Sequence, residues 1–224
     1  QASGKRILIT AGGTRERIDS VRYIGNMSSG RTASRLADEL TSAGYNVTWL
    51  GAQDAMKPDL TNTMVHFSSF DDLGQRLQTL LLENDYDAVI HAAAVSDFSV
   101  ASVLTEQGSS LDKSGGKLSS ASDLLLRLKP NPKLLDRIRG WSKNPDVQVI
   151  GFKLTDTEDQ NQRIAAVKKQ FDDSKVDAVV HNDLSDISKE AHPFCLHTLK
   201  REPVNCADSE AVAKTTDQLL ERVS

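Results

Sequence analysis

Short apolar runs rich in β-branched residues alternate along this chain with segments of helical periodicity, and this alternation constrains the fold more than any other feature. We expect strands at 7–10, 46–50, 64–67, 88–92, 148–152 and 178–180, and helices at 32–43, 71–83, 133–139 and 159–171. Such alternation is typical of a doubly wound, mostly parallel α/β sheet, which is the Rossmann-like arrangement. These sheets bind ligands beyond the carboxyl ends of their strands. We therefore predict one nucleotide-binding α/β domain over residues 1–224.

Three segments depart from this rhythm. The first comprises the residues between Thr14 and Val21, which are expected to form a polar loop. (The regular helix at 71–83 is expected to begin near Asp71 or Asp72.) Residues 99–122 have no clear periodicity and are rich in glycine and serine, which predicts a long flexible active-site loop. Residues 192–204 predict a C-terminal β-hairpin, and 209–222 a closing helix.

The composition narrows the choice of partners. The formal net charge of −4 gives the whole chain no attraction for nucleic acid or an anionic membrane. No apolar run approaches the roughly 18 residues of a membrane span, and no charged-then-apolar leader stands at the start. The two cysteines, Cys195 and Cys206, lack the spacing of a metal site. We expect a cytoplasmic protein that binds small molecules, with neither nucleic acid nor membrane as a partner.

Glycines and a helix start near the N-terminus predict an anion site. Gly12, Gly13 and Thr14 close the first strand, and Ser28, Ser29 and Gly30 precede the first helix. Glycines let the backbone approach a ligand, and a helix start offers unpaired N–H groups. A nucleotide or a phosphorylated ligand is therefore the leading hypothesis. The alternative for Gly12–Thr14 is a plain tight turn, because the G-x-G-x-x-G fingerprint is incomplete.

The fourth expected strand ends in a run of small residues, His91 to Ala94, which is also found in NAD(P)-dependent reductases. Those enzymes carry a catalytic Tyr-x-x-x-Lys, which this chain lacks. Asp97 follows the run, and is either a turn residue or a carboxylate near nucleotide-bound Mg²⁺. Lys113 and Lys117 lie in the expected loop, where a lysine is either solvated or able to close on a phosphate.

Several short motifs occur together and in a fixed order. They are TAGGTRE from Thr10, IDSVR-x-I-x-N-x-SSG from Ile18, AAAVSD from Ala92, KLSS from Lys117, NPK from Asn131, GFK from Gly151 and ND from Asn182. Together they resemble phosphopantothenate–cysteine ligase (phosphopantothenoylcysteine synthetase), in its stand-alone form, over roughly residues 5 to 220. Gly151–Leu154 reads Gly-Phe-Lys-Leu, which is similar to the monofunctional branches of that family.

This resemblance implies a two-step reaction of coenzyme A biosynthesis. The carboxylate of 4′-phosphopantothenate attacks the α-phosphate of a nucleoside triphosphate, which releases pyrophosphate and leaves an acyl-nucleotide. The amine of L-cysteine then displaces the monophosphate. Mg²⁺ is implied as the metal. CTP is the expected nucleotide and ATP the alternative, because the second of two basic positions on the helix after Phe152 falls at Asp173 here.

The resemblance also implies roles for individual residues. Asn26 would handle the acyl-nucleotide, Arg22 would act beside it, and Lys117 would close over the reacting phosphate. The remaining implied contacts are Ser28, Ser29 and Gly30 with the phosphate of phosphopantothenate; Ala92, Ala93 and Ala94 with substrate and nucleotide; and Asp97, Asn131, Pro132, Lys133, Leu134, Phe152, Lys153 and Lys169 on the nucleotide side.

Members of the family are homodimers in which a loop of one subunit helps to close the site of the other. We expect the interface near Cys195–Thr198 or near Arg15–Gly25. Two alternatives to the ligase stay open from the sequence. One is an NAD(P)-binding oxidoreductase, and the other is a non-catalytic nucleotide-binding protein of the same fold.

Overall fold

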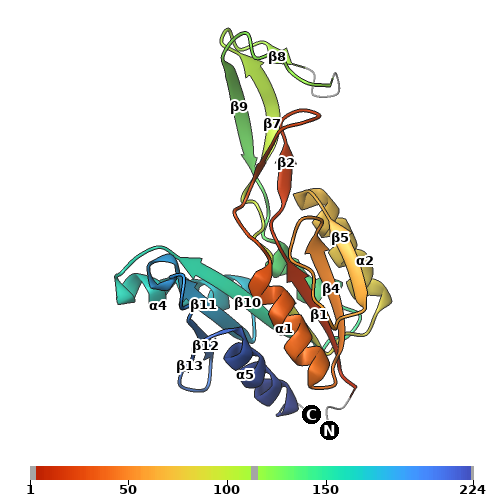
Figure 1. Cartoon of the computed structure of the whole chain (residues 1–224), viewed down its shortest axis with the longest axis vertical. Helices are drawn as coiled ribbons and strands as arrows, with labels where there is room; N and C mark the ends of the chain where they lie inside the picture. The colour runs from red at the N-terminus through yellow and green to blue at the C-terminus, as the bar shows by residue number, and fades with distance from the viewer. Residues whose placement is uncertain (1–3, 112–115, 223–224) are drawn as a thin grey trace.

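The computed structural model describes residues 4–111 and 116–222, and is built on a large sheet with the strand order β13-β12-β11-β10-β6-β1-β4-β5 (Figure 1). The strands of this sheet are β1 (Arg6–Ala11), β4 (Asn46–Ala52), β5 (Thr63–Phe67), β6 (Ala88–His91), β10 (Gln148–Thr155), β11 (Ala178–Asp183), β12 (Phe194–Thr198) and β13 (Val204–Cys206). Neighbouring strands in the part β11-β10-β6-β1-β4-β5 of this sheet are parallel, whereas β12 and β13 add an antiparallel edge. The predicted mostly parallel sheet and its C-terminal hairpin are confirmed.

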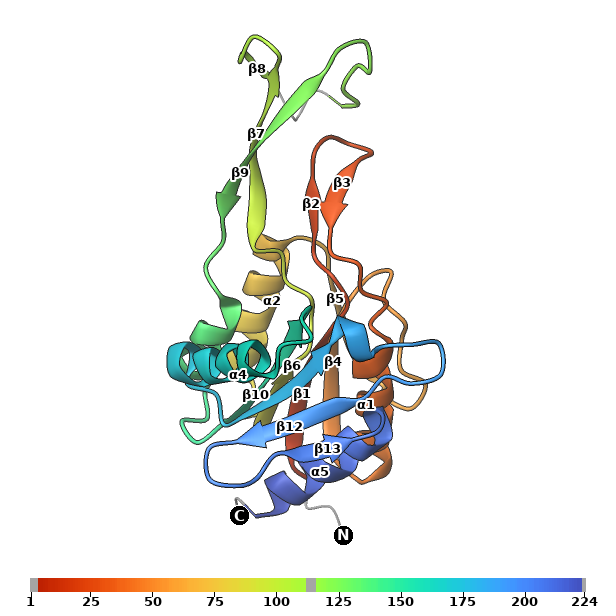
Figure 2. The same cartoon turned by 90° about the vertical axis from the view of Figure 1, so that its left-hand side faces the viewer.

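Helices cover both faces of the sheet, as a doubly wound fold requires. The main helices are α1 (Arg31–Ser42), α2 (Phe70–Glu83), α3 (Ile138–Trp141), α4 (Gln160–Ser174) and α5 (Ser209–Glu221). On one face α1 packs against α5, and on the other α2 packs against α3 (Figures 1 and 2). No helix in the described part of the chain is long and apolar enough to cross a membrane.

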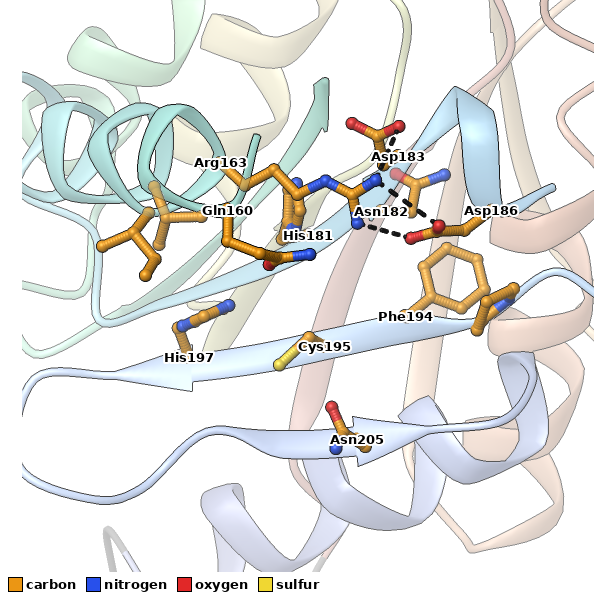
Figure 3. Close-up of a pocket in the computed structure, with 13 residues that line it drawn as sticks. Gln160, Arg163, His181, Asn182, Asp183, Asp186, Phe194, Cys195, His197 and Asn205 are labelled. Carbon is orange, nitrogen blue, oxygen red and sulfur yellow. Dashed lines mark hydrogen bonds and ion pairs between the residues drawn. The ribbon is translucent and has the colours of Figure 1, made fainter. Parts of the chain in front are cut away.

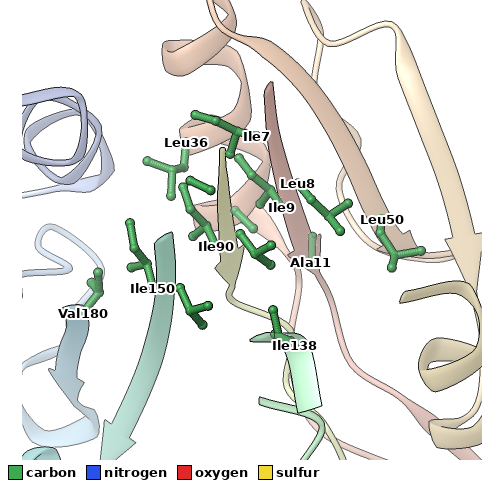
Figure 4. Close-up of a cluster of buried hydrophobic side chains, with 14 of the residues drawn as sticks. Ile7, Leu8, Ile9, Ala11, Leu36, Leu50, Ile90, Ile138, Ile150 and Val180 are labelled. Carbon is green, nitrogen blue, oxygen red and sulfur yellow. The ribbon is translucent and has the colours of Figure 1, made fainter. Parts of the chain in front are cut away.

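The core lies along the central strands. Ile7, Leu8 and Ile9 of β1 have no exposed surface, because a central parallel strand is covered on both faces. Leu36 of α1 and Ile138 of α3 reach this strand region from opposite sides (Figure 4). Continuous apolar runs therefore identified the central strands correctly.

The expected loop at 99–122 is wrong as secondary structure. Three antiparallel strands, β7 (Phe98–Thr105), β8 (Ser110–Leu111) and β9 (Leu124–Pro130), form a projecting ribbon that we call the arm (Figure 2). Its register shifts between Val100 and Ser102, which breaks the two-residue alternation that would have indicated a strand. Lys113 lies outside the described residues, and the mobility of this segment stays a prediction.

A second projection replaces the expected polar loop after Thr14. Strands β2 (Arg15–Arg17) and β3 (Tyr23–Gly25) form an antiparallel hairpin beside the arm (Figure 2). Two boundaries also differ from expectation. The side chain of Ser69, rather than Asp71 or Asp72, caps α2 by accepting from the Asp72 amide, and the helix expected at 133–139 starts as a 3-10 turn, η2 (Leu134–Arg137).

Candidate active site

A cleft of about 630 Å³ opens beyond the carboxyl ends of β6, β10 and β11. The chain runs from β1 outward to β4 and β5 and then returns to β6 on the other side of β1, so the cleft lies at the topological switch point. Most of the predicted site residues line it: Asn26, Ser28, Ser29, Gly30, Ala92, Ala93, Ala94, Asp97, Pro132, Lys133, Leu134, Phe152, Lys153 and Lys169. Six others do not: Gly12, Gly13, Thr14, Arg22, Lys117 and Asn131.

The glycine turn after β1 lies buried beneath the cleft. Gly12 has φ +83°, and a Cβ there would come within 2.7 Å of the Ala52 Cβ. A Cβ on Gly13 would come within 2.8 Å of the Asn26 carbonyl oxygen. Both glycines therefore permit close backbone packing, and that of Gly13 lets the segment bearing Asn26 cross over the end of β1.

The start of α1 forms one wall of the cleft and is built to receive an anion. Gly30, with φ +72°, is the N-cap residue, and no side chain caps the helix. The first turn contains no acidic residue. The Arg31 amide has only a long bond, 3.3 Å, to the Ser29 hydroxyl. First-turn amides without a side-chain cap and the positive end of the helix dipole together favour a phosphate.

Asn26 stands at the rim beside this helix start. Its side chain is exposed, lines the cleft, and has no hydrogen-bond partner among the described residues. A free carboxamide can donate to a developing oxyanion without changing its own protonation.

The floor of the cleft is fixed by a buried chain of hydrogen bonds. The Ala93 amide donates to the Thr10 hydroxyl over 3.1 Å, and that hydroxyl lies 2.9 Å from Nδ1 of His91. Burial lowers the pKa of His91 to about 4, so the imidazole is neutral at pH 7. Neutral His91 and the Thr10 hydroxyl can share this hydrogen bond in either direction, according to the tautomer of the imidazole. This bonding holds the small-residue run against β1.

A second wall of the cleft is organised by an amide and an ion pair. The Asn131 side chain donates to the Ser96 carbonyl over 3.1 Å, and its backbone amide donates to the Asp97 carbonyl over 2.8 Å. Asn131 therefore ties the end of the arm to the strand end without lining the cleft. Asp97 and Lys133 form an exposed ion pair at the cleft surface.

On α4, Lys169 faces the cleft but forms an ion pair with Asp173, one turn later. This pairing raises the pKa of Lys169 through the hydrogen bond from its ammonium group to the Asp173 carboxylate. The Gln170 side chain donates to the Phe152 carbonyl over 3.1 Å and so joins α4 to β10.

At the far end of the cleft the sequence motif that begins at Asn182 was recognised, but four other lining residues were missed. Asn182 of β11 lies 2.9 Å from Nε2 of His192, and the His192 ring stacks on Phe194 of β12 with centroids 4.5 Å apart. Leu184 and Ile187 complete this end. His192 and Phe194 carry no local signal, because only the antiparallel return of β12 brings them to the cleft. Leu184 and Ile187 follow the end of β11 directly, but they are apolar residues in no recognised motif.

A smaller cavity, of about 280 Å³, shares Asn182 and Phe194 with the cleft (Figure 3). The Arg163 guanidinium lies 3.1 Å from the Asp183 carboxylate and 2.7 Å from that of Asp186. Burial alone would raise the pKa of Asp183, but hydrogen bonds, including one from Ser185, hold it below its usual range. This paired network anchors the start of α4 to the end of β11.

Arg22 and Lys117 lie away from the lining, on the two projections. Arg22 belongs to the tip of the β2–β3 hairpin, and Lys117 to the part of the arm that faces this tip. Within residues 4–111 and 116–222, no cluster of three or more His, Cys, Asp or Glu side chains could hold a metal ion.

A doubly wound sheet with an uncapped helix start at its switch-point cleft defines the class: an α/β protein of the kind that binds nucleotides and phosphorylated ligands. Residues 2–223 match the family described as the DNA/pantothenate metabolism flavoprotein C-terminal domain, and the chain belongs to this family.

Two relatives bear the name coenzyme A biosynthesis bifunctional protein CoaBC. That of Thermococcus kodakarensis is 33% identical over 193 residues, which cover 86% of this chain and 45% of the relative. That of Methanocaldococcus jannaschii is 34% identical over 182 residues, which cover 81% of this chain and 41% of the relative. The chain thus spans less than half the length of each.

Solved structures share the whole fold. The DNA/pantothenate metabolism flavoprotein from Streptococcus pneumoniae has a TM-score of 0.87 and 28% identity, and the match covers 98% of this chain and 100% of that one. A Cab2 mutant in complex with phosphopantothenate-cysteine has a TM-score of 0.75 over 98% of this chain and 88% of that one. At 18% identity, this second likeness concerns the fold alone.

Proposed function

We propose that this chain catalyses the joining of 4′-phosphopantothenate to L-cysteine through an acyl-nucleotide intermediate. The observation that carries the proposal is the cleft itself, which has the uncapped start of α1 beside the free carboxamide of Asn26 and lysines on the nucleotide side. One phosphorylated substrate and one nucleotide can therefore be held side by side. Membership of the family and the names of the two CoaBC relatives support the same reaction.

The chemistry asks the protein mainly to orient groups and to balance charge. The carboxylate oxygen of phosphopantothenate bonds to the α-phosphorus, and pyrophosphate leaves. The amine of cysteine then bonds to the acyl carbon, loses a proton, and displaces the nucleoside monophosphate. In this scheme the amides at Gly30 and Arg31 hold the substrate phosphate. Asn26 donates to the oxygen that becomes negative.

For the nucleotide we propose CTP, with ATP as the alternative. Lys133 and Lys169 each have a carboxylate partner, Asp97 and Asp173, and we infer that the lysines exchange these partners for phosphates when the triphosphate binds. The second basic position expected on α4 is occupied by Asp173. The net positive charge of this wall is therefore lower than it would be with basic residues at both positions.

The residues of the same wall could supply Mg²⁺ with one carboxylate ligand. Asp97, Asp136 and Asp173 line the cleft, and their partners in the structure are Lys133, Ser174 and Lys169 respectively. Triphosphate oxygens and water would supply most of the ligands and Asp97 one, which is how Mg²⁺ is usually held at nucleotides. When bound, the ion would neutralise charge on the triphosphate.

We also propose that the working form is a homodimer whose interface includes the Arg15–Gly25 hairpin. Large apolar side chains are exposed on this hairpin and the arm: Val21, Tyr23, Ile24, Phe98, Leu125 and Leu128. Exposed apolar surface of this kind marks an interaction site. Arg22 and Lys117 do not line the cleft of their own subunit. In a dimer formed through this surface, they could reach the cleft of the partner subunit.

The test is pyrophosphate release with 4′-phosphopantothenate and Mg²⁺, with CTP and ATP compared, and with and without L-cysteine. Release that requires phosphopantothenate is the expected result. An NAD(P)-dependent reductase is the less supported alternative, because the family and the relatives point to coenzyme A biosynthesis. No release with either nucleotide, together with a fluorescence change of NADPH on binding, would favour that alternative. Binding of CTP or ATP without turnover would favour a non-catalytic protein.

A further inference from the structure

The projecting hairpin and the arm meet at one buried carboxylate. The side chain of Asp19, at the tip of the β2–β3 hairpin, has no exposed surface. Its Oδ1 accepts from the amides of Val21 and Arg22, at 3.0 and 2.8 Å. Its Oδ2 accepts from Nε of Arg22 at 3.0 Å and from the amide of Leu118 at 3.0 Å. Asp19 therefore bonds to its own turn through Oδ1, and to both Arg22 and the arm through Oδ2.

Both backbone polar groups of Leu118 are hydrogen-bonded to the hairpin tip. Its N–H donates to Asp19, and its carbonyl accepts from Nη2 of Arg22 at 2.8 Å. A further contact, from the Ser20 amide to the Gly116 carbonyl at 3.4 Å, lies on the other side of Lys117. Lys117 thus sits between two backbone positions that the hairpin tip holds, while its own side chain is exposed.

The hydrogen bonds at this junction require an ionised carboxylate at position 19. Hydrogen bonds from Arg22 are the main reason that the pKa of Asp19 lies below its usual range, so the group stays ionised at neutral pH. Charge-assisted bonds are stronger than neutral ones. An asparagine at position 19 would fill the same space but would turn one acceptor into a donor, which cannot face both Arg22 and the Leu118 amide.

We propose that Asp19 is a positioning residue that joins Arg22 and Lys117 into one unit for the reaction. The inference rests on the proposed function, because it takes Arg22 and Lys117 to act on the reacting phosphate. Asp19 itself touches neither substrate nor nucleotide. It fixes the Arg22 guanidinium and the Leu118 peptide in one geometry, and so it sets where the neighbouring Lys117 ammonium can reach. Without it, each of the two cations would have to be ordered separately at every turnover.

The test compares wild type, Asp19→Asn, and the matched control Asp54→Asn. Asp54 forms an ion pair with Arg15 of the hairpin and has no hydrogen bond or ion pair with the described residues of the arm, so its substitution removes one Arg–Asp pair and leaves the Leu118 contacts intact. Hydrogen exchange at the Leu118 amide reports on the junction directly, and thermal melting reports on folding. Pyrophosphate release gives kcat and the KM for phosphopantothenate.

We expect Asp19→Asn to speed exchange at Leu118 and to lower kcat about tenfold or more, the scale of losing a hydrogen bond to a charged group. The KM for phosphopantothenate should change little, because its phosphate binds at the start of α1. Asp54→Asn should match wild type in all three measurements. Unchanged exchange at Leu118 would overturn the junction, and faster exchange with unchanged kcat would overturn the positioning role. An inactive wild type would instead overturn the proposed function, and with it any catalytic meaning of the junction.

Discussion

The buried imidazole of His91 should make the stability of this protein depend on pH in a way that can be calculated. Burial lowers the pKa of His91 from 6.5 to about 4 in the folded protein. As the pH falls below about 6.5, the unfolded chain takes up a proton at this position, but the folded protein does not until about pH 4. The contribution of neutral His91 to stability is therefore complete above pH 6.5 and is lost as the pH falls toward 4.

The size of the effect follows from the pKa difference. Between about pH 8 and about pH 5, linkage predicts a loss of about 2 kcal/mol in the free energy of unfolding, and about 3 kcal/mol once the pH is below 4. The variant is His91→Asn, because its carboxamide can hydrogen-bond to the Thr10 hydroxyl as donor or acceptor but does not titrate. Urea unfolding followed by the fluorescence of buried Trp49 gives the free energy at each pH.

Other titrating groups are common to both proteins, so the difference in pH slope belongs to His91. We expect the wild type to lose about 2 kcal/mol more than His91→Asn over this range. Equal slopes for the two proteins would refute the reasoning, since the neutral buried imidazole would then have no energetic consequence.

Three further predictions concern the site, the helix start and the interface. Asn26→Asp should slow the cysteine step by about 10² and let acyl-nucleotide accumulate in acid-quenched samples; normal turnover would remove Asn26 from the chemistry. Gly30→Ala should lower the unfolding free energy by about 2–3 kcal/mol, measured by urea, since a Cβ would lie 2.8 Å from that of Ala55. Gly108→Ala, where φ is also positive but the space is open, should cost only about 1 kcal/mol, and equal losses would count against the close-packing argument. Ile24→Asp should dissociate the dimer in sedimentation experiments and Leu199→Asp should not; the reverse pattern would place the interface at the Cys195–Thr198 hairpin.

The sequence predicted the central strands, because burial on both faces requires a continuous apolar run. The run Ile7–Ile9 reads as a strand because both faces of β1 are covered, and the same holds for Ala88–His91 of β6. The arm carries no such constraint. Phe98 at its base is 49% exposed, so its strands have no continuous buried face whose alternation could be recognised. Local pattern therefore identified the sheet and missed both projections.

The same distinction applies to the cleft. Ser28–Gly30 was predicted as an anion site because it precedes a helix, and the residues from Ala93 on as site candidates because they follow a strand; both segments line the cleft. His192 and Phe194 reach it only through the antiparallel return of β12, a long-range placement with no local signal. Gly13 does not line the cleft, and the sequence could not show this, because a glycine needed for packing against Asn26 has the same local pattern as one that contacts a phosphate.

The most direct test of the account follows oxygen from substrate to product. Phosphopantothenate labelled with ¹⁸O in its carboxylate is turned over with L-cysteine, Mg²⁺ and the better of CTP and ATP, and the products are analysed by mass spectrometry. Attack on the α-phosphate leaves one carboxylate oxygen on the nucleoside monophosphate, so we predict one ¹⁸O there and none in pyrophosphate. Label in inorganic phosphate, or a labelled substrate recovered without any transfer, would contradict ligation through an acyl-nucleotide.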